Sequence, residues 1–512
     1  MENLELTKDM EELSERELDR LFADFEYTKD EDGYVLTGIK RRNAAVEVKI
    51  PYGVVRIAEN AFRLCNNLRE ITIPPTLTKF DKNAFWGCPA LNAVNIEDIS
   101  AWCESTFAGE NSNPLQYAQH LYKGAVRQDT LVIPDTVRQI ADHAFSGCVC
   151  LEKLYISGDV TRIGKNAFSE CKYLTEVSIS GNVTVIDEEA FRSCNALKTV
   201  HLPYKLEVIG DFAFRYCYSL ESAKLPPSLK SIGTCAFDGC THLAELTFQG
   251  DKVEQIGKMA FEDCYRLERV NIPSLADWCK IKFVTDGYDT ASPVYYSKGL
   301  YIDGAPVTDA QIPEGVSSIC ERAFFNNKTV KTVTVPPTVE QIGDDAFLEC
   351  TNLERVYVTD LAAWCRINFV GRCWSNPLET AKGLYVSNTD ELLADITVPE
   401  GTDRVSPSAF YGYKALKSIS LPEGLKVIGE FAFKNCSSLQ TVTLPSTIER
   451  IEPRAFEDAD SIKTIRFRGT KKQWKKVEVA SVFEYLSYEG KKKKEKTNTA
   501  FCKAKVIFDW KD

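Results

Sequence analysis

The stretch LKTVHLPYKLEVIGDFAFRYCYS, from Leu197 to Ser219, holds the pattern that decides the fold of this 512-residue chain. Leu197, Val200 and Leu202 place apolar side chains on one side of a short extended segment. Pro203 follows directly and ends that segment, because proline cannot donate to a strand ladder. The pattern therefore predicts one short strand at the start of the stretch.

The second half of the same stretch predicts a turn and a return. Leu206 and Ile209 are expected to fill the turn, and Gly210 suits a backbone corner where a side chain would crowd a neighbouring coil. Phe214 and Cys217 stand at helical spacing and predict a short helical return. One such unit cannot bury its apolar residues alone, whereas stacked copies can.

An Ala-Phe pair marks each copy of this unit, and it recurs thirteen times in register along the chain. Most neighbouring copies stand 23 residues apart, so the chain is a repeat array and we expect one elongated domain. The phenylalanines are Phe62, Phe85, Phe145, Phe168, Phe191, Phe214, Phe237, Phe261, Phe324, Phe347, Phe410, Phe433 and Phe456.

The unit L-x-x-V-x-I-P-x-x-V-x-x-I-G-x-x-A-F-x-x-C resembles the BspA-like class of leucine-rich repeats, over about residues 33–468. The resemblance implies a leucine-rich repeat solenoid, of the α/β class but rich in β structure. It implies a curved right-handed stack with one parallel strand per coil and short helical returns. It also implies a binding or adhesion role, as in bacterial surface proteins.

Three intervals between Ala-Phe pairs are longer than the rest, at 60, 63 and 63 residues. The added segments, about residues 97–133, 273–312 and 359–398, are copies of one another and share Trp-Cys pairs at Trp102, Trp278 and Trp364. We interpret each as a long repeat with a short helix anchored by Trp, a loop and an extra coil. Their recurring Tyr122, Tyr301 and Tyr385 are predicted to pack in the core.

Both ends differ from the repeat and are predicted to be caps. Residues 1–32 are predicted as an N-terminal helical cap, with a capping box at Ser14 and Glu17, and residues 33–467 as the solenoid. Residues 468–512 are predicted as a C-terminal cap, closed by a strand at 505–508. It starts like a fourth insertion but is not expected to return to an Ala-Phe unit. Its basic segment Lys491 to Lys496 is either a contact for an acidic partner or membrane surface, or a solvated loop.

Charge and hydropathy narrow the class of partner and the compartment. The net charge of −11 disfavours nucleic-acid binding, and no apolar stretch reaches the length of a membrane span. The N-terminus lacks signal-peptide features, which together with free thiols predicts a cytoplasmic protein. The family resemblance implies the cell surface or secretion instead, through a missing leader or unconventional export.

Ten of the eighteen cysteines share one slot, three residues after the Phe, and three more follow the insertion Trp directly. A position repeated once per coil indicates packing, so we predict buried structural thiols rather than disulfides or metal ligands. The ten are Cys65, Cys88, Cys148, Cys171, Cys194, Cys217, Cys240, Cys264, Cys350 and Cys436.

The sequence contains no G-x-S-x-G, H-E-x-x-H, Walker A or G-x-G-x-x-G motif, so no catalytic, metal or cofactor residues are assigned and the protein is not expected to be an enzyme. Side chains flanking the central Val of each strand should point outward. The candidates for partner binding on this face are Tyr155, His201, Lys224, Arg269, Arg355 and Tyr357, and those in the insertion loops are Tyr288 and Trp374.

The leading hypothesis is a protein-interaction module whose unknown partner is a protein, such as a host or cell-surface protein. A glycan is the alternative ligand. A self-assembling structural solenoid is the second hypothesis, and a hydrolase built from insertion loops is the third. The oligomeric state is left open.

Overall fold

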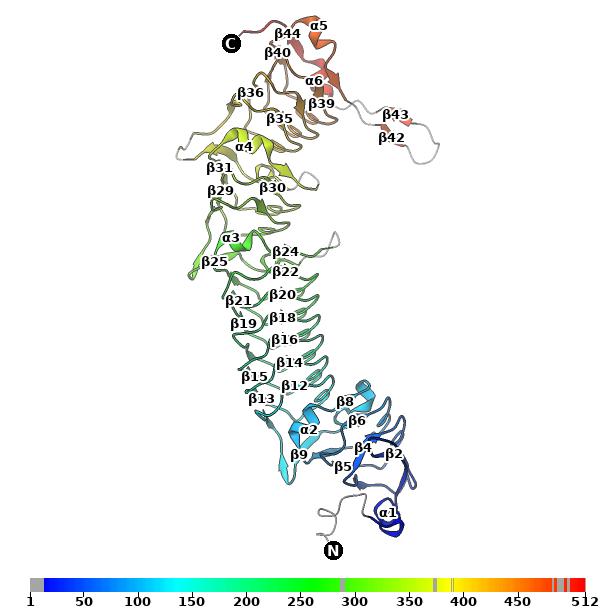
Figure 1. Ribbon diagram of the computed structural model, residues 1–512. Coiled ribbons are helices and arrows are strands. Elements are labelled where there is room, and N and C mark those ends of the chain that lie inside the picture. The colour runs from blue at the N-terminus through cyan, green and yellow to red at the C-terminus, as the bar shows by residue number, and fades with distance from the viewer. Residues whose placement is uncertain are drawn as a thin grey trace. The chain divides into compact units, whose positions relative to one another are not determined.

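The computed structural model describes residues 13–285, 291–371, 375–387, 389, 391–480, 483–485, 492–494 and 498–511 (Figure 1). The chain divides into two compact units instead of the single domain expected from the repeat. Unit 1 comprises Met1–Glu268 and Val284–Tyr296, and unit 2 comprises Arg269–Phe283 and Ser297–Asp512. The division falls in the second insertion, where the regular repeat is interrupted.

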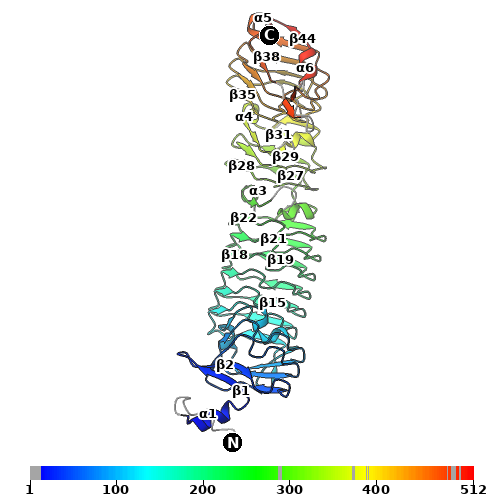
Figure 2. The ribbon, with the colours of Figure 1, turned by 90° about the vertical axis from the view of Figure 1, so that its right-hand side faces the viewer.

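Each unit is a stack of coils, and each regular coil contributes two parallel strands. In one coil of unit 1, β17 (Thr199–His201) is the long strand and β18 (Val208–Ile209) is the short one. Long strands pair with long strands and short with short, and the two kinds form separate columns in Figure 2. The predicted solenoid of parallel strands is confirmed, with one strand more per coil than predicted. Val208 and Ile209 form a ladder where a turn was expected.

The strands of unit 1 fall into four groups of hydrogen-bonded neighbours. The N-terminal short-strand group is β1 (Phe25–Lys29), β2 (Tyr34–Ile39), β4 (Val54–Ile57), β6 (Lys79–Phe80) and β8 (Thr106–Phe107). The N-terminal long-strand group is β3 (Glu47–Lys49), β5 (Glu70–Ile73), β7 (Ala93–Ile96), β9 (His120–Lys123) and β10 (Val126–Arg127). The next long strands are β11 (Thr130–Ile133), β13 (Lys153–Ile156), β15 (Glu176–Ile179), β17, β19 (Ser222–Leu225) and β21 (Glu245–Phe248). Their short partners are β12 (Gln139–Ile140), β14 (Arg162–Ile163), β16 (Val185–Ile186), β18, β20 (Ser231–Ile232) and β22 (Gln255–Ile256).

Unit 2 repeats this arrangement. Its long strands are β23 (Arg269–Asn271), β25 (Leu300–Ile302), β27 (Asp309–Gln311), β29 (Thr332–Val335), β31 (Arg355–Val358), β33 (Gly383–Val386), β34 (Asp395–Thr397), β36 (Ser418–Ser420), β38 (Thr441–Leu444), β40 (Thr464–Phe467) and β44 (Lys505–Ile507). Its short strands are β24 (Lys282–Phe283), β28 (Ser318–Ile319), β30 (Gln341–Ile342), β32 (Asn368–Phe369), β35 (Arg404–Val405), β37 (Val427–Ile428), β39 (Arg450–Ile451) and β41 (Glu478–Val479). β26 (Ala305–Pro306) pairs with β25 at the end of a long-strand sheet, and β42 (Phe483–Tyr485) pairs with β43 (Lys492–Lys494).

The core of each coil stack is a ladder of phenylalanine rings. Phe191 and Phe214 lie parallel to within 3° with ring centroids 5.3 Å apart, and Phe214 is stacked in turn on Phe237 at 5.2 Å. These rings are fully buried, together with the inward Leu, Val and Ile of the strands. Because every coil repeats the same side chains in the same register, each ring covers its neighbour.

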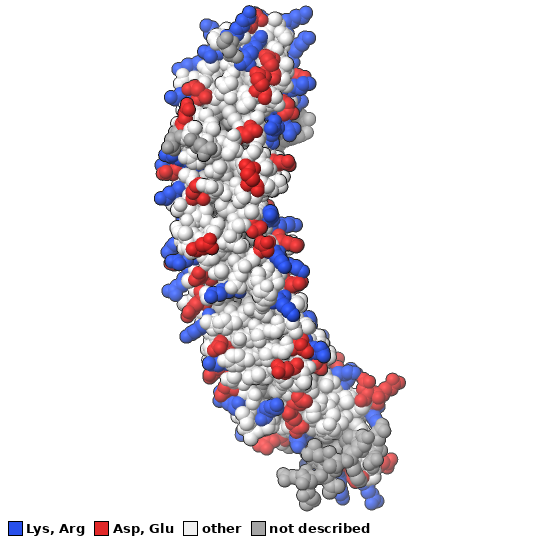
Figure 3. Space-filling model, turned by 60° about the vertical axis from the view of Figure 1, so that its left-hand side comes forward, with Lys and Arg blue, Asp and Glu red and all other residues white. Residues whose placement is uncertain are grey.

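The surface carries charges of both signs. On the side of the molecule shown in Figure 3, Lys and Arg are interspersed with Asp and Glu, without a broad region of one sign. Many of these charges pair between neighbouring coils, as Lys230 does with Glu207 at 2.8 Å and Lys165 with Glu188 at 2.8 Å. Such exposed pairs contribute little stability each.

The return segments are runs of turns and not the short helices that the spacing of Phe214 and Cys217 suggested. Main-chain N–H groups that would bond within a helix donate to the next coil instead, as Phe168 N does to Ala190 O at 2.8 Å. Two residues per coil adopt left-handed backbone to allow this, for example Asn166 with φ 55° and Glu170 with φ 60°. Spacing of three residues therefore fits a turn as well as a helix.

Gly210 confirms the predicted close approach of two coils. A Cβ atom at this position would lie 2.6 Å from the carbonyl carbon of Asp187 and 2.6 Å from the nitrogen of Glu188. Both are main-chain atoms of the preceding coil, which cannot rotate away. Glycine is therefore needed here for space.

The three long repeats begin with the short helices α2 (Ile99–Cys103), α3 (Leu275–Trp278) and α4 (Leu361–Arg366). The indole of Trp102 donates from Nε1 to Ala144 O at 2.7 Å, and Trp364 donates to Ala409 O at 2.9 Å. In both cases the acceptor is the alanine of the next Ala-Phe pair. Each Trp is 1% exposed. The predicted anchoring of the insertion by Trp is confirmed, and the anchor is a hydrogen bond as well as packing.

Each insertion also ends one long-strand sheet. After β9 the chain turns back as β10 in an antiparallel hairpin, and after β25 it turns back as β26. In the first insertion Leu121 N donates to the thiol of Cys150 at 3.2 Å. In the third, Leu384 N donates to the hydroxyl of Tyr413 at 3.3 Å. At the point where the long-strand sheet stops, a side chain of the following coil thus accepts a hydrogen bond from a main-chain N–H group.

The N-terminal end is covered by a helix and a hairpin. Helix α1 (Glu15–Leu21) begins with the predicted capping box, in which Ser14 N donates to Glu17 Oε2 at 2.8 Å. Antiparallel β1 and β2 follow, and β2 pairs with β4 of the first coil. The predicted boundary at residue 32 falls inside the turn between β1 and β2.

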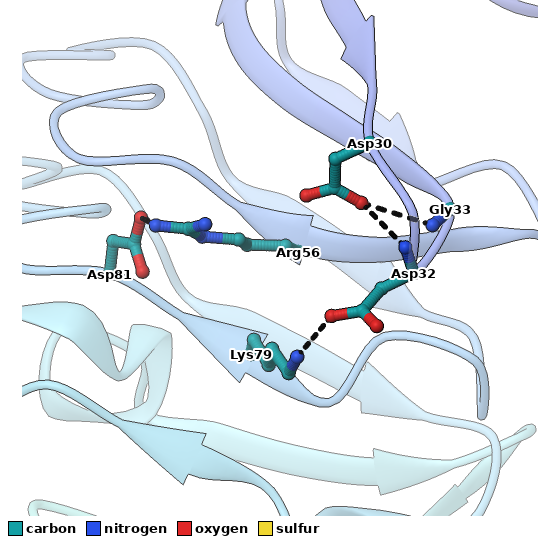
Figure 4. A network of polar contacts seen from close by, with 6 residues as sticks. All are labelled: Asp30, Asp32, Gly33, Arg56, Lys79 and Asp81. Atoms are coloured by element: carbon teal, nitrogen blue, oxygen red, sulfur yellow. Dashed lines mark hydrogen bonds and ion pairs between the residues drawn. The ribbon is translucent and has the colours of Figure 1, made fainter.

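Polar contacts fasten that turn to the first coils (Figure 4). Asp30 accepts from the main-chain N–H groups of Asp32 and Gly33, at 3.0 and 3.1 Å. Lys79 donates to Asp32 at 2.6 Å and lowers the pKa of that carboxyl. Beside it, Arg56 holds Asp81 through Nη2 at 2.6 Å.

The C-terminal end contains α5 (Lys471–Trp474) and α6 (Thr499–Lys503). The predicted closing strand is β44, which pairs with β40. The prediction that the fourth insertion does not return to an Ala-Phe unit is wrong. Ala500 and Phe501 form such a pair, and the Phe501 ring stacks on Phe456 with centroids 4.4 Å apart. The phenylalanine ladder of unit 2 thus continues into the cap.

Candidate interaction surface

The open face of the long-strand sheets presents the side chains that flank each buried central residue. Along β13 and β31 exposure alternates strictly, because successive side chains of a strand point to opposite faces. Six sequence-predicted candidates lie on this face, in both units. His201, Lys224 and Arg269 are exposed, and Tyr155, Arg355 and Tyr357 are half-buried. Tyr288 and Trp374 lie outside the described residues.

The candidates of unit 1 are spread out and are not gathered into one group. Tyr155 lies on β13 and donates its hydroxyl to Glu176 on β15 at 3.1 Å. His201 and Lys224 lie on the neighbouring strands β17 and β19. The structure therefore gives Tyr155 a partner within the sheet and leaves His201 and Lys224 as separate exposed side chains of this face.

In unit 2 the structure brings Arg355 and Tyr357 together with Tyr385. Arg355 Nη1 donates to the Tyr357 hydroxyl at 3.1 Å, and its guanidinium lies 5.3 Å from the centre of the Tyr385 ring. The rings of Tyr357 and Tyr385 are neighbours across β31 and β33, with centroids 5.5 Å apart and planes tilted by 41°. Gly383 stands opposite Arg355 in the ladder, and Leu392 packs where its side chain would be.

The same arrangement recurs at the second insertion and at the C-terminal cap. The Arg269 guanidinium lies 5.5 Å from the centre of the Tyr301 ring, on the paired strands β23 and β25. Arg466 on β40 lies 4.2 Å from the centre of the Trp510 ring. We call Arg269–Tyr301, Arg355–Tyr385 and Arg466–Trp510 the arginine–aromatic pairs. Such contacts hold both side chains in place before any partner binds.

Tyr122, Tyr301 and Tyr385 were predicted to lie in the core, and this is wrong. All three are half-buried on the open face, where each follows a fully buried leucine. Strand alternation in the Leu-Tyr dipeptide was the signal that could have shown it. In the first insertion Ala93 stands where an arginine would be, so Tyr122 has the ring of His120 as its neighbour at 6.3 Å instead.

The cysteines are arranged for structure. Eight thiols of the repeated slot donate to the carbonyl of the phenylalanine in the preceding coil, as Cys217 does to Phe191 at 3.3 Å. Burial raises the pKa of Cys279 and Cys365 to about 12, so these thiols stay protonated. All cysteines in the described part of the chain are free, and no group of three metal-ligating side chains occurs there.

A polar hollow of about 300 Å³ lies in unit 2, beside the third insertion, between Glu379, Lys414, Asn435, Ser437 and Asp458. Burial raises the pKa of Glu379, and Lys414 opposes this shift. No helix in the described ranges is long and apolar enough to cross a membrane.

Comparison with known proteins agrees with the repeat. The sequence profile described as "BspA type Leucine rich repeat region (6 copies)" matches residues 42–123, 116–226, 207–282, 300–364 and 387–485. No curated protein sequence is significantly similar to the chain.

Two solved structures are similar along most of the chain. A leucine-rich repeat protein from Bacteroides ovatus is 22% identical, with 87% of this chain and 98% of that protein covered and a TM-score of 0.41. A leucine rich cell surface protein from Faecalibacterium prausnitzii is 24% identical, with 90% and 97% covered and a TM-score of 0.31. With the profile matching more than half of the residues, the chain belongs to the BspA-type leucine-rich repeat family.

Proposed function

We propose that the protein is a non-enzymatic binding scaffold that recognises a protein partner through the open long-strand face of unit 2. The arginine–aromatic pairs carry this proposal. Arginine and aromatic side chains supply most of the binding energy at protein interfaces. Arg355 and Tyr385 stand half-buried on paired strands, and Arg355 is already fixed by Tyr357 and Tyr385.

The fixed positions of Arg355, Tyr357 and Tyr385 are a second reason to expect binding, in addition to the chemistry of these side chains. A side chain that is ordered before association loses less conformational entropy when a partner is bound. The strand ladder under Arg355, Tyr357 and Tyr385 is continuous from β29 to β33, so their relative positions are set by main-chain hydrogen bonds. At the first insertion, in unit 1, Ala93 replaces the arginine beside Tyr122, so this pair does not form there.

The chemistry of the thiols supports placing this function in a reducing compartment. The free cysteines of the described residues are almost all buried, and many already donate to main-chain carbonyls. Disulfides are rare in the cytosol and common outside the cell, so a protein that uses thiols in this way suits the cytoplasm. Fractionation of the native cells checks the placement, and recovery of the protein only at the cell surface would contradict it.

The test compares partner capture by matched variants of the full chain. A partner is first identified by cross-linking in the native cells and then produced in pure form. The double variant Arg355→Ala with Tyr385→Ala should weaken its binding at least tenfold, measured by calorimetry. The control Ser178→Ala with Thr199→Ala alters the same kind of face in unit 1 and should leave binding unchanged.

Self-assembly is the alternative, and the same variants separate it. If light scattering shows a mass that rises with concentration, and Arg355→Ala with Tyr385→Ala abolishes that rise, the face joins copies of this chain and the proposal of a foreign partner is wrong. Equal binding by both double variants would place the contact elsewhere on the molecule.

A further inference from the structure

A row of exposed tyrosines in unit 1 is not needed by the repeat. Tyr173, Tyr218 and Tyr265 follow the slot cysteines Cys171, Cys217 and Cys264 by one or two residues. Their side chains are 65%, 42% and 72% exposed. We call these three residues the tyrosine ridge.

The ridge lies on one corner of the coils. Main-chain hydrogen bonds join this corner from coil to coil, from Ala196 N to Lys172 O at 3.2 Å and from Ser219 N to Asn195 O at 3.3 Å. The bond from His242 N to Tyr218 O, also 3.2 Å, continues the series. The corner is separate from the open face of the long strands, because the buried Leu174, Leu197 and Leu220 lie between the two in sequence and point inward.

Packing does not explain aromatic residues at these slots. In unit 2 the corresponding pairs of residues contain no aromatic side chain, although the coils stack in the same way. They are Lys328 and Thr329, Thr351 and Asn352, Lys414 and Ala415, Ser437 and Ser438, and Asp460 and Ser461. The ridge is therefore a property that unit 1 has in addition to its fold.

The tyrosines occur on every second coil. Between them lie the coil of Asn195 and Ala196 and the coil of Thr241 and His242. Neighbouring parallel strands lie about 4.8 Å apart, so two coils advance by roughly 10 Å. Tyr218 and Tyr265 both follow the slot cysteine directly, so they form platforms about 10 Å apart. Tyr173 lies two coils before Tyr218, one residue further from its cysteine.

Two rings of the ridge, those of Tyr218 and Tyr265, are held in position by contacts within the protein. Tyr218 stacks on Tyr216 with centroids 5.9 Å apart, and Tyr216 lies beneath the Arg215 guanidinium at 4.5 Å. Arg215 is itself fixed by Asp238, with Nε to Oδ2 at 2.7 Å. Tyr265 donates its hydroxyl to Asp263.

Most charges beside the ridge are already paired, and an exception is the exposed Arg266 next to Tyr265. Lys172 lies 3.8 Å from Glu170, Arg192 lies 3.1 Å from Glu189, and Arg215 is bound to Asp238. Within the described structure, the hydroxyls of Tyr173 and Tyr218 form no hydrogen bond to the protein. The ridge therefore offers aromatic platforms and free hydroxyl donors, with little unpaired charge. Its complement is an uncharged ligand rich in acceptors.

We propose that the tyrosine ridge binds a proline-rich segment of another protein in the polyproline II conformation. That helix repeats every 3 residues and rises about 3.1 Å per residue, so one face recurs every 9.3 Å or so. This matches the spacing of the platforms to within about 1 Å. Its carbonyl groups are unpaired acceptors, and proline supplies no competing N–H donor. Grooves lined by aromatic residues are the usual receptors for such segments.

Other chain conformations fit less well. An extended strand repeats each face every two residues, or about 6.7 Å, which does not match the platforms. An α-helix presents a face at a similar interval, but its carbonyls are used within the helix and would leave the tyrosine hydroxyls without acceptors. A β-linked glycan would need acceptors for its many hydroxyls, and the carboxylates of Asp238 and Asp263 beside the ridge already accept from Arg215 and Tyr265.

The test is a binding titration of the full chain with fluorescein-labelled dodecaproline, followed by anisotropy. Saturable binding is expected, and Tyr173→Ala and Tyr265→Ala should each weaken it at least fivefold. Tyr204→Ala is the matched control, because Tyr204 is 76% exposed in the same stack but lies in the turn after Pro203. It should bind like the unaltered protein. A Gly-Ser dodecapeptide of equal length should bind at least tenfold more weakly.

Three results would overturn the proposal. They are the absence of saturable dodecaproline binding, a loss in Tyr204→Ala equal to that in the ridge variants, and ridge-dependent binding of a β-1,4-linked N-acetylglucosamine hexamer without binding of dodecaproline. Circular dichroism of each variant shows whether the stack is intact. The sheet-face variants of unit 2 should bind dodecaproline normally, so the two proposals fail separately.

Discussion

The thiol of Cys217 donates to the main-chain carbonyl of Phe191 in the preceding coil, with Sγ and O 3.3 Å apart. The carbonyl oxygen of Phe191 also accepts from Cys194 N at 3.3 Å. The thiol of Cys217 therefore donates to the second lone pair of this oxygen. The contact repeats between coils along both units. Cysteine fits this slot because it combines a small apolar volume with a weak donor. The slot therefore links coils as well as filling space.

Replacement of Cys217 by alanine should destabilise the protein by about 1–2 kcal/mol, because the variant loses one weak hydrogen bond and leaves a small void. The urea midpoint, followed by circular dichroism, measures this. Cys502→Ala is the control, since Cys502 is exposed, and it should change stability by less than about 0.5 kcal/mol. Equal losses in the two variants would show that the thiol-to-carbonyl ladder contributes nothing.

The buried thiols also predict how stability depends on pH. Burial raises the pKa of Cys194, Cys217 and Cys240 above the ordinary value of 9.0. In the unfolded chain these thiols ionise near pH 9, whereas in the folded chain they stay protonated. Their contribution is complete below pH 9 and is lost as the pH rises above it, by up to about 1.4 kcal/mol per thiol and pH unit.

Urea midpoints at pH 7.5, 9 and 10.5 measure this dependence. Tyrosine and lysine also titrate there, so the informative comparison is with Cys194→Ala combined with Cys217→Ala. That variant has two fewer buried thiols and should lose less stability between pH 9 and pH 10.5 than the unaltered protein. Parallel curves for the two proteins would contradict the assignment to thiols.

The sequence predicts the stacking of coils well, because a fixed slot in every repeat carries the same physical demand. Strand alternation alone predicts that the six candidates of the long strands lie on the open face. The second strand was missed since Val208 and Ile209 are too few to show a period, and the helical return was wrong because a spacing of three residues also fits turns. The pair Ala500-Phe501 was missed because Phe501 follows Phe456 by 45 residues instead of 23.

The candidate site was predicted only in part, for a different reason. Arg355 and Tyr357 are two apart in one strand, so alternation places both on the same face. The stacking of Arg355 on Tyr385 depends on which strand pairs after an insertion of irregular length. The residue pattern predicts which side chains lie on the open face. Which strands pair across an insertion is known only from the structure.

The anchoring role of the insertion tryptophan gives a third prediction. Trp364→Phe keeps an aromatic ring but removes the donor to Ala409 O, and should destabilise the third insertion by about 2–4 kcal/mol. Hydrogen exchange should accelerate in peptides covering residues 359–410. Trp86→Phe is the control, since Trp86 is 40% exposed, and it should leave exchange unchanged in its own coil. Equal protection of residues 359–410 in Trp364→Phe and the unaltered protein would contradict the prediction.

The return of the phenylalanine ladder in the C-terminal cap gives the last prediction. Phe501 is 1% exposed and stacks on Phe456 within 9° of parallel, and Asn498 beside it accepts from Phe456 N at 2.7 Å. Phe501→Ala should therefore loosen the cap by about 3–5 kcal/mol, as for other buried phenylalanines. Limited proteolysis should then cut after residue 467 much faster than in the unaltered protein, while unit 1 stays intact. Phe508→Ala, at a half-buried position of the same cap, should have a smaller effect. If Phe501→Ala resists proteolysis as well as Phe508→Ala does, the cap is held by β44 alone and the ladder ends at Phe456.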